Sequence, residues 1–273
     1  MQKNIFKKVT SGMCLLALFY GICFAGGPFE PPIELPIKPP KNINVDVFTK
    51  SDCYCEYKDG TENKISPTGV MIRSYNTPYD QLKRLYNVRT EASATPSVHT
   101  CVDQDRVYVC LPFNTRAWHC GGKCNDTHLT IMMIEPDNLE YNGTHSKIIT
   151  DKTSLTDLQK ESYTKTYKTA VWLTAYFVRK FNMNLNDKSA VLGHCEAYAK
   201  TPEKNRNDRT LRLASNMSTP NHAFQLFDLS MDKFREYVQN QVNYWNEFGY
   251  SKTEQKLIEH MEENLKKYTL TIK

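Results

Sequence analysis

Four histidines, His99, His119, His194 and His222, are the side chains of this sequence whose type best suits chemistry. Imidazole is a common zinc ligand, and a catalytic zinc site needs three protein ligands and one open position for water. Bound zinc lowers the pKa of that water to about 7, which supplies a nucleophile at neutral pH. One expectation is therefore a zinc site built from His194, His222 and Glu196. The alternative, which we prefer, is that the imidazoles make ordinary hydrogen bonds, because nothing in the spacing makes three ligands converge.

The elements that must position these residues follow from hydrophobic periodicity. Short apolar runs at 69–72, 98–101, 107–111, 129–134 and 189–193 predict strands, of which the second and third form a hairpin. Apolar residues three and four apart predict a long helix over 154–181, and Ser230 is a suitable N-cap for another. Further helices are expected at 80–86 and 253–267. Because strands and helices alternate, the sequence predicts an α/β domain.

Four ordered segments together resemble one known family. They are Thr68 to Tyr75, Ser97 to Thr100, Leu111 to Gly122 and Val191 to Tyr198, and the most specific run is Arg-Ala-Trp-His-Cys-Gly-Gly at 116–122. In order and spacing they are similar to the zinc-dependent N-acetylmuramoyl-L-alanine amidases, which include phage endolysins and animal peptidoglycan recognition proteins. The resemblance covers roughly residues 66–240. It implies a central mixed β-sheet flanked by helices, and hydrolysis of the amide between the lactyl group and L-alanine of peptidoglycan.

Most functional positions that the resemblance identifies are altered in this chain. The first histidine ligand of the family falls on Arg73, and the third ligand, an Asp or Cys before a proline, falls on Thr219. A guanidinium stays protonated and has no lone pair, so Arg73 does not ligate zinc. The family's catalytic glutamate falls on Met132 and a basic position on Met217, which leaves His194 as the one retained ligand. We therefore expect no catalytic residue and no cofactor, with zinc present only if the site is rebuilt.

Four residues are candidate substrate contacts: His99, Trp118, His119 and Arg73. The resemblance places the equivalents of His99 and His119 near the substrate groove, and an indole is suited to stacking on a sugar. The expected partner is peptidoglycan or a muropeptide.

The sequence is compatible with three functions, which belong to different classes. The first is a catalytically impaired homologue that still binds peptidoglycan fragments. The second is an active amidase with a rearranged zinc site around His194. The third is a scaffold reused for an unrelated protein interaction through Arg73 and the charged segment 200–212.

The N-terminus has the pattern of a secretory signal peptide. Lys3, Lys7 and Lys8 precede an uncharged, mostly apolar run from Met13 to Ala25, shorter than the ~20 residues of a membrane span. We expect residues 1–25 to be removed, a secreted or periplasmic location, and no stable membrane span afterwards. Those lysines carry much of the formal net charge of +5, so we expect no nucleic-acid partner.

The rest of the chain divides into three expected parts. Residues 26–65 are rich in proline and predict an extended linker with a cysteine-containing segment. Residues 66–245 form the amidase-like domain, and 246–273 a C-terminal amphipathic helix.

The cysteines beyond the signal segment suit an oxidising compartment. They are Cys53, Cys55, Cys101, Cys110, Cys120, Cys124 and Cys195, which allow up to three disulfides. Local spacing favours a Cys120–Cys124 disulfide, because two glycines lie in the short loop between them. Cys101 and Cys110 flank the predicted hairpin and form a second possible pair. No CxxC pair is present, which argues against a zinc knuckle.

Overall fold

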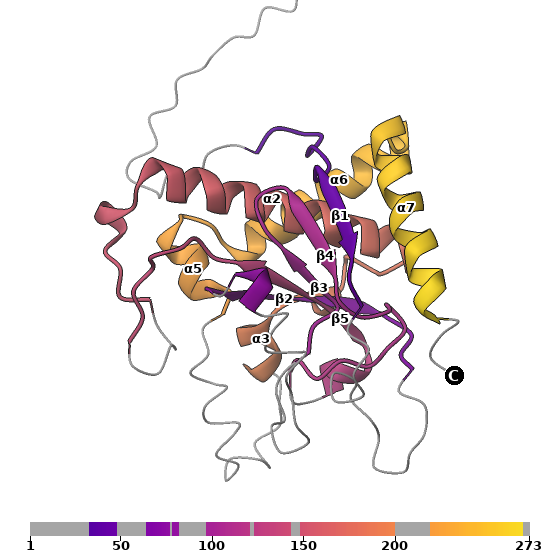
Figure 1. The fold of residues 1–273 in the computed structure, drawn as a ribbon, viewed down its shortest axis with the longest axis horizontal. Coiled ribbons are helices and arrows are strands. Elements are labelled where there is room, and N and C mark those ends of the chain that lie inside the picture. Colours follow the sequence, from indigo (N-terminus) through magenta and orange to yellow (C-terminus); the bar gives the residue numbers. More distant parts are fainter. Residues whose placement is uncertain are drawn as a thin grey trace, which may run out of the picture.

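Six strands form one mixed sheet in the order β1-β4-β3-β5-β2-β6 in the computed structural model of the chain (Figure 1). They are β1 (Asn42–Val45), β2 (Gly69–Tyr75), β3 (Thr100–Val102), β4 (Arg106–Val109), β5 (His128–Ile134) and β6 (Val191–Gly193). Strands β3, β5, β2 and β6 run parallel, whereas β4 is antiparallel to β3. The structure describes residues 33–47, 64–76, 78–81, 97–120, 123–142, 148–199 and 219–269. The predicted α/β class with a central mixed sheet is confirmed.

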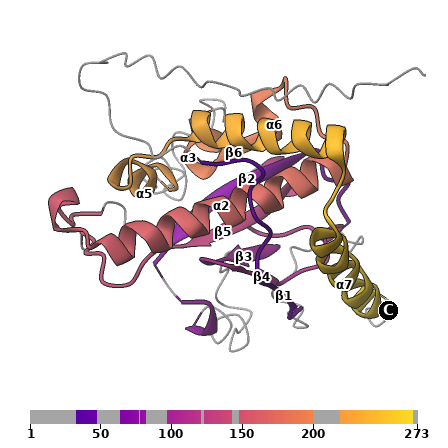
Figure 2. The ribbon, with the colours of Figure 1, turned by 90° about the horizontal axis from the view of Figure 1, so that it is seen from above.

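Helices cover the sheet on both sides. They are α2 (Asp157–Lys180), α3 (His194–Ala199), α5 (Asn221–Leu226), α6 (Met231–Phe248) and α7 (Lys252–Thr269), with short 3-10 turns η2 (Lys123–Asp126), η3 (Lys152–Ser154) and η4 (Lys188–Ala190). Helix α2 packs against β5, β2 and α6, and Figure 2 shows α2 and α6 running side by side. Helix α3 follows β6 and lies on the other side of the sheet from α2 (Figure 1).

The predicted long helix is α2, which starts three residues later than its apolar pattern suggested. Thr156 caps it: the Thr156 hydroxyl accepts from the Gln159 N–H (3.2 Å), and the Gln159 side chain accepts from the Thr156 N–H (3.0 Å). This reciprocal pair satisfies backbone donors that have no partner within the helix. Ser230 caps α6 as predicted, accepting from the Lys233 N–H at 3.2 Å.

The two faces of the sheet bury different sets of side chains. Alternate residues of a strand point to opposite faces. On one face, Val70, Ile72, Leu129, Ile131 and Met133 join the main core with the residues of α2 and α6. On the other face, a smaller cluster contains Met132, Cys101, Tyr108, Cys110 and Leu111. The register sets Arg73 directly opposite Met132, so these two candidate site residues share this second face.

Residues 33–47 belong to the packed domain and are not a spacer. Ile33, Ile37 and Ile43 are at most 7% exposed, and β1 pairs in parallel with β4. The backbone N–H of Ile37 donates to the Gln241 side chain of α6 at 2.8 Å. Proline density predicted an extended segment, but the isoleucines between the prolines supply apolar surface that is stabilised by burial.

Some predictions fall outside the described residues. These are the signal peptide, Cys53, Cys55, the charged segment 200–212, Met217 and most of the helix predicted at 80–86, which the structure shows beginning at Tyr79. Among the described helices, none is both long and apolar enough to cross a membrane.

The five described cysteines, Cys101, Cys110, Cys120, Cys124 and Cys195, are all thiols in the structure, so the Cys120–Cys124 disulfide that local spacing favoured is not formed. The Cys120 thiol instead donates to the Asn125 side chain at 3.1 Å. Cys101 and Cys110 lie close together across the hairpin, with 4.0 Å between their sulfur atoms. Burial raises the pKa of the Cys110 thiol and keeps it protonated.

A buried carboxylate attaches α7 to the domain. One oxygen of Glu254 accepts from the indole N–H groups of Trp172 (3.0 Å) and Trp245 (2.9 Å), and the other accepts from the Ser251 N–H (2.7 Å). Glu254 is 4% exposed. Three N–H donors therefore replace the water that this carboxylate loses on folding.

Replacing Glu254 by Ala should lower the free energy of unfolding by roughly 2–4 kcal/mol, because it leaves buried N–H donors without an acceptor. Urea denaturation measures the change. Glu259→Ala on the exposed side of the same helix is the control and should change the value by less than about 0.5 kcal/mol. Equal effects of the two substitutions would show that Glu254 does not hold the helix.

Candidate functional site

The site is built where β2, β5 and the start of α3 meet on the second face of the sheet. Arg73 is on β2, Met132 is its direct neighbour on β5, and His194 is the first residue of α3. The charge of Arg73 acts on both His194 and His119, so these three side chains are close together. The structure therefore brings together Arg73, Met132, His119 and His194.

Arg73 occupies the first position of the site as a buried cation. Arg73 is only 8% exposed, and its Nη1 donates to the carbonyl oxygen of His119 at 2.9 Å. Burial, followed by the charge of Arg73, lowers the pKa of His194 well below its ordinary value of 6.5. His194 is consequently neutral, and the fixed positive charge beside it repels a divalent cation.

Thr219 is committed to the backbone of β2. Its hydroxyl oxygen accepts from the Ser74 N–H at 2.7 Å and its hydroxyl donates to the Ser74 carbonyl at 3.1 Å. Both bonds are buried, and a cis peptide joins Thr219 to Pro220. Thr219, which the sequence predicts at the third ligand position, therefore links the start of α5 to the central strand.

The residues of the rebuilt zinc site do not converge. Glu196 forms a two-pronged ion pair with Arg235 (2.9 and 3.0 Å) and also accepts from the Gly193 N–H at 2.8 Å. His222 contacts Glu135 instead, with 3.0 Å between Nε2 and the carboxylate. Within the described ranges, no three His, Cys, Asp or Glu side chains are grouped so that they hold a metal ion.

His99 is a scaffold residue, because both of its ring nitrogens are used. The Thr130 N–H donates to Nδ1 (3.0 Å), so Nε2 carries the proton and donates to the Thr115 carbonyl (2.8 Å). The residue is fully buried, and burial lowers its pKa to about 4. A substrate does not reach His99; its ring ties β5 to the loop after β4.

His119 is also buried, at 2% exposure, and its Nε2–H donates to the His128 carbonyl at 3.0 Å. Burial, with smaller effects from neighbouring His99, Arg73 and His128, lowers the pKa of His119 well below its ordinary value. Its backbone carbonyl receives the Arg73 guanidinium. His119 therefore links Arg73 on β2 to the start of β5.

Trp118 is the candidate substrate contact that faces solvent, with 44% of its surface exposed. Its backbone N–H donates to the Ser97 hydroxyl and its carbonyl accepts from the Ser97 N–H, both at 2.8 Å. The Arg116 guanidinium lies 6.0 Å from the ring centre. These contacts hold the indole in place while leaving it available for stacking on a ligand.

A model of the family described as N-acetylmuramoyl-L-alanine amidase matches residues 63–210, which is more than half of the chain. The chain belongs to this family. Among curated proteins none matches.

Solved structures resemble this amidase-family chain in fold. The hydrolase AmiA of Staphylococcus aureus, in complex with its ligand, is 13% identical with a TM-score of 0.53, over 82% of this chain and 97% of that chain. The catalytic domain of XlyA is 17% identical with a TM-score of 0.46, over 72% and 99%. PlyL is 15% identical with a TM-score of 0.47, over 72% and 96%. At these identities the likeness shows the fold alone.

The residues that the sequence predicts at the metal position do not form a set of zinc ligands. Arg73 is a buried cation, and the Thr219 hydroxyl is bonded to Ser74. A neutral His194 is one suitable ligand, but a catalytic site needs three. No step of a reaction is therefore assigned to a metal in this chain.

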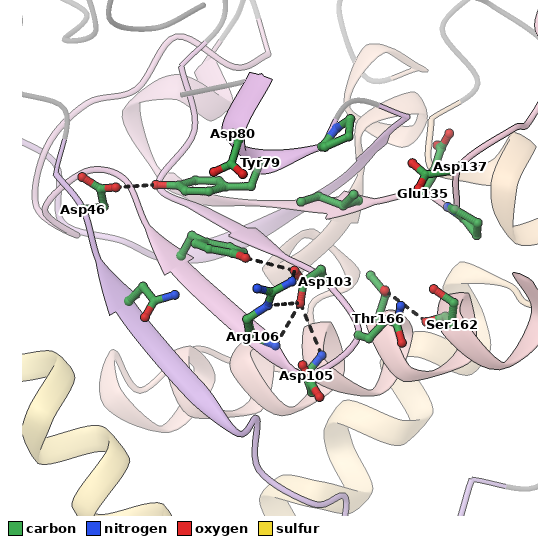
Figure 3. Close-up of a pocket in the computed structure, with 16 residues that line it drawn as sticks. Asp46, Tyr79, Asp80, Asp103, Asp105, Arg106, Glu135, Asp137, Ser162 and Thr166 are labelled. Carbon is green, nitrogen blue, oxygen red and sulfur yellow. Dashed lines mark hydrogen bonds and ion pairs between the residues drawn. The ribbon is translucent and has the colours of Figure 1, made fainter. Parts of the chain in front are cut away.

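An acidic hollow of about 620 Å³ lies at the edge of the sheet where β3 and β5 end (Figure 3). The Tyr79 and Tyr108 rings, stacked at 3.7 Å, form part of its wall. Six carboxylates and one guanidinium line it: Asp46, Asp80, Asp103, Asp105, Glu135, Asp137 and Arg106. Asp103 is already paired with Arg106 and with the Tyr108 hydroxyl. The excess of carboxylates disfavours anionic groups here, in contrast to the surroundings of Arg73.

Sequence reasoning missed Asn125, which shapes the loop that carries His119. The Asn125 carbonyl oxygen accepts from the N–H groups of His119 (3.0 Å) and Cys120 (2.9 Å), and the residue is 1% exposed. The available signal was its position shortly after two consecutive glycines in the sequence, since an Asn side chain often satisfies loop backbone donors. The Glu135–His222 pair was missed because its partners are far apart in sequence.

The neutral, buried His99 should make stability fall on acidification. Its folded pKa of about 4 lies below the ordinary 6.5, so the unfolded chain binds the proton first. The contribution of the neutral His99 ring to the free energy of unfolding is present above pH 6.5 and is lost as the pH falls from there towards 4. Between pH 7 and pH 5 the loss from His99 is about 2 kcal/mol.

The variant His99→Gln keeps a hydrogen-bond donor and an acceptor, but its side chain does not titrate. The decrease of the unfolding free energy between pH 7 and pH 5 should therefore be smaller by about 2 kcal/mol. Denaturant unfolding at several pH values measures it. His260→Gln, on exposed α7 surface, is the control and should leave the slope unchanged. An unchanged slope in the His99 variant would contradict the assignment.

Proposed function

We propose that this protein is an exported member of the amidase family that binds peptidoglycan or muropeptides without hydrolysing them. The observation that carries the proposal is Arg73, a buried guanidinium at the first ligand position, bonded to the His119 carbonyl. The proposal of export rests on the signal-peptide pattern of residues 1–25.

Loss of turnover follows from the chemistry of amide hydrolysis. A peptide-like amide needs an activated water, which zinc supplies in the family, and a base that takes the proton from that water. Arg73 and Thr219 do not supply ligands, and the thioether of Met132 is not a base. The buried carboxylate nearest in sequence, Glu135, is paired with His222.

Two exposed aromatic side chains near Arg73, Trp118 and Tyr75, support the proposal that the protein still binds peptidoglycan. Trp118 is held by Ser97 and Arg116 and presents its ring to solvent. Tyr75, at the end of β2, is also 45% exposed. Aromatic rings stack on the apolar faces of sugars, so this surface suits a glycan-containing ligand.

The wild-type protein should take up little zinc, and restoring the family ligands should change this. We expect the variant Arg73→His with Thr219→Asp to bind zinc near one equivalent, and to lose it on the further change His194→Ala. Metal content after zinc soaking and dialysis measures the outcome. Near-stoichiometric zinc in the wild type that depends on His194 would favour the active-amidase alternative instead.

The mature protein should sediment with insoluble peptidoglycan and release no stem peptides from it. Trp118→Ala should weaken binding about tenfold, because a stacking aromatic contributes roughly 1 kcal/mol or more. Phe248→Ala is the matched control: Phe248 is 64% exposed but lies on α6, across the sheet. Absence of wall binding in the wild type would favour the third function, a scaffold reused for protein interaction.

A further inference from the structure

A second hollow, of about 510 Å³, lies on the helical side of the domain, away from Trp118. Its walls are the C-terminal end of α2, the turn that follows this helix, and the middle of α6. Five carboxamides line it: Asn182, Asn184, Asn186, Gln239 and Asn246. No carboxylate is among the lining residues, so this hollow, unlike the acidic one, does not repel an anionic ligand.

Several of these carboxamides are available to a ligand. Asn184 accepts from the Asn186 N–H at 3.1 Å, and Gln239 donates to Asn243 at 2.9 Å. The side chains of Asn182, Asn186 and Asn246 make no hydrogen bond to any other described residue. Each carboxamide offers both donors and an acceptor, which is the pattern that hydroxyl and acetamido groups require.

Arg179 supplies the one positive charge of the hollow. It is in the last turn of α2, and its guanidinium carbon lies 4.6 Å from the centre of the Tyr250 ring. Arg179 is among the residues that line the hollow, and no carboxylate of the described residues forms an ion pair with it. A guanidinium held by an aromatic ring and lacking a counter-ion is suited to receive a ligand carboxylate.

We propose that this hollow binds a sugar that bears a carboxylate. The carboxamides hydrogen-bond its hydroxyl or acetamido groups, and Arg179 pairs with the carboxylate. The apolar side chains of Val178, Met183, Leu185 and Val242 complete the lining and face the C–H surface of the ring. The volume is within the range of small-ligand sites.

The chemistry of the ligand places it in a reaction sequence. N-acetylmuramic acid carries a lactyl carboxylate, which is masked as an amide while the stem peptide is attached. Hydrolysis of that amide consumes one water, leaves the carboxylate on the sugar and releases the amine of L-alanine. An amidase reaction must therefore precede binding of a glycan strand here. This link to the wall rests on the proposed function, whereas recognition of the acidic sugar does not.

Titration of the mature protein with N-acetylmuramic acid and with N-acetylglucosamine tests the proposal, because the two differ by the lactyl carboxylate. Calorimetry or ligand-observed NMR should show N-acetylmuramic acid binding about tenfold more tightly. Arg179→Gln should reduce its affinity to that of N-acetylglucosamine. Glucuronic acid, which also carries a carboxylate, should bind more tightly than N-acetylglucosamine, and Arg179→Gln should remove this difference in affinity.

Asn246→Asp provides a second variant that is not expected to disturb folding, because Asn246 is exposed. The added carboxylate repels an acidic ligand, so affinity for N-acetylmuramic acid should fall about tenfold. Asn42→Asp, which makes the same charge change at an exposed position on β1, outside the lining, is the control.

Equal affinity for the two sugars, or no binding at millimolar concentration, would overturn the proposal. Binding that is abolished by Trp118→Ala and unaffected by Asn246→Asp would also overturn it, because the sugar would then occupy the opposite face. Failure of the proposed function is recognised separately, by loss of sedimentation with intact peptidoglycan while the Asn246-dependent binding of N-acetylmuramic acid persists.

Discussion

The parallel ladder between β2 and β5 is the constraint on which the rest of the structure depends. It runs from Gly69 opposite His128 to Tyr75 opposite Ile134, in the middle of the sheet. Gly69 is required at its start, since a side-chain carbon there would lie 2.5 Å from the His128 ring. That ring is fixed in turn by a bond to the Ser189 carbonyl at 2.7 Å, just before β6. A slip of one strand by one residue would turn all its side chains to the opposite face of the sheet.

Because this ladder is fixed, the altered residues are fixed beside one another. Arg73 and Met132 face the same side as neighbours, and the next residue, Ser74, receives Thr219 on its backbone. Arg73 and Thr219 are each held by buried hydrogen bonds. Arg73 bonds to the His119 carbonyl, and Asn125 bonds to the backbone N–H of the same residue. A buried charge is tolerated only when hydrogen bonds replace its hydration, which these contacts begin to do.

Two surfaces of opposite character result, separated by the sheet and its helices. The face of Arg73 carries the exposed indole of Trp118, with an acidic hollow at its edge. The helical face carries the carboxamide-lined hollow with the single charge of Arg179. A polymer such as peptidoglycan presents both glycan and peptide repeats, and a protein that engages two of them gains affinity from their linkage. Helix α7 contributes to neither surface; Glu254 fixes it against Trp172 and Trp245.

The sequence by itself determined the local elements and the family. Periodicity and capping residues act within one helix or strand, so the pattern of α2 and the Ser230 cap were predictable. An arginine side chain has no lone pair for a metal in any fold, so the inability of Arg73 to ligate zinc is also determined by the sequence. Only the tertiary structure decided that residues 33–47 join the sheet, that Thr219 bonds to Ser74, and that Glu196 pairs with Arg235 rather than with a metal. These contacts join side chains that are far apart in sequence, and their free energy depends on distances that exist only after the chain has packed.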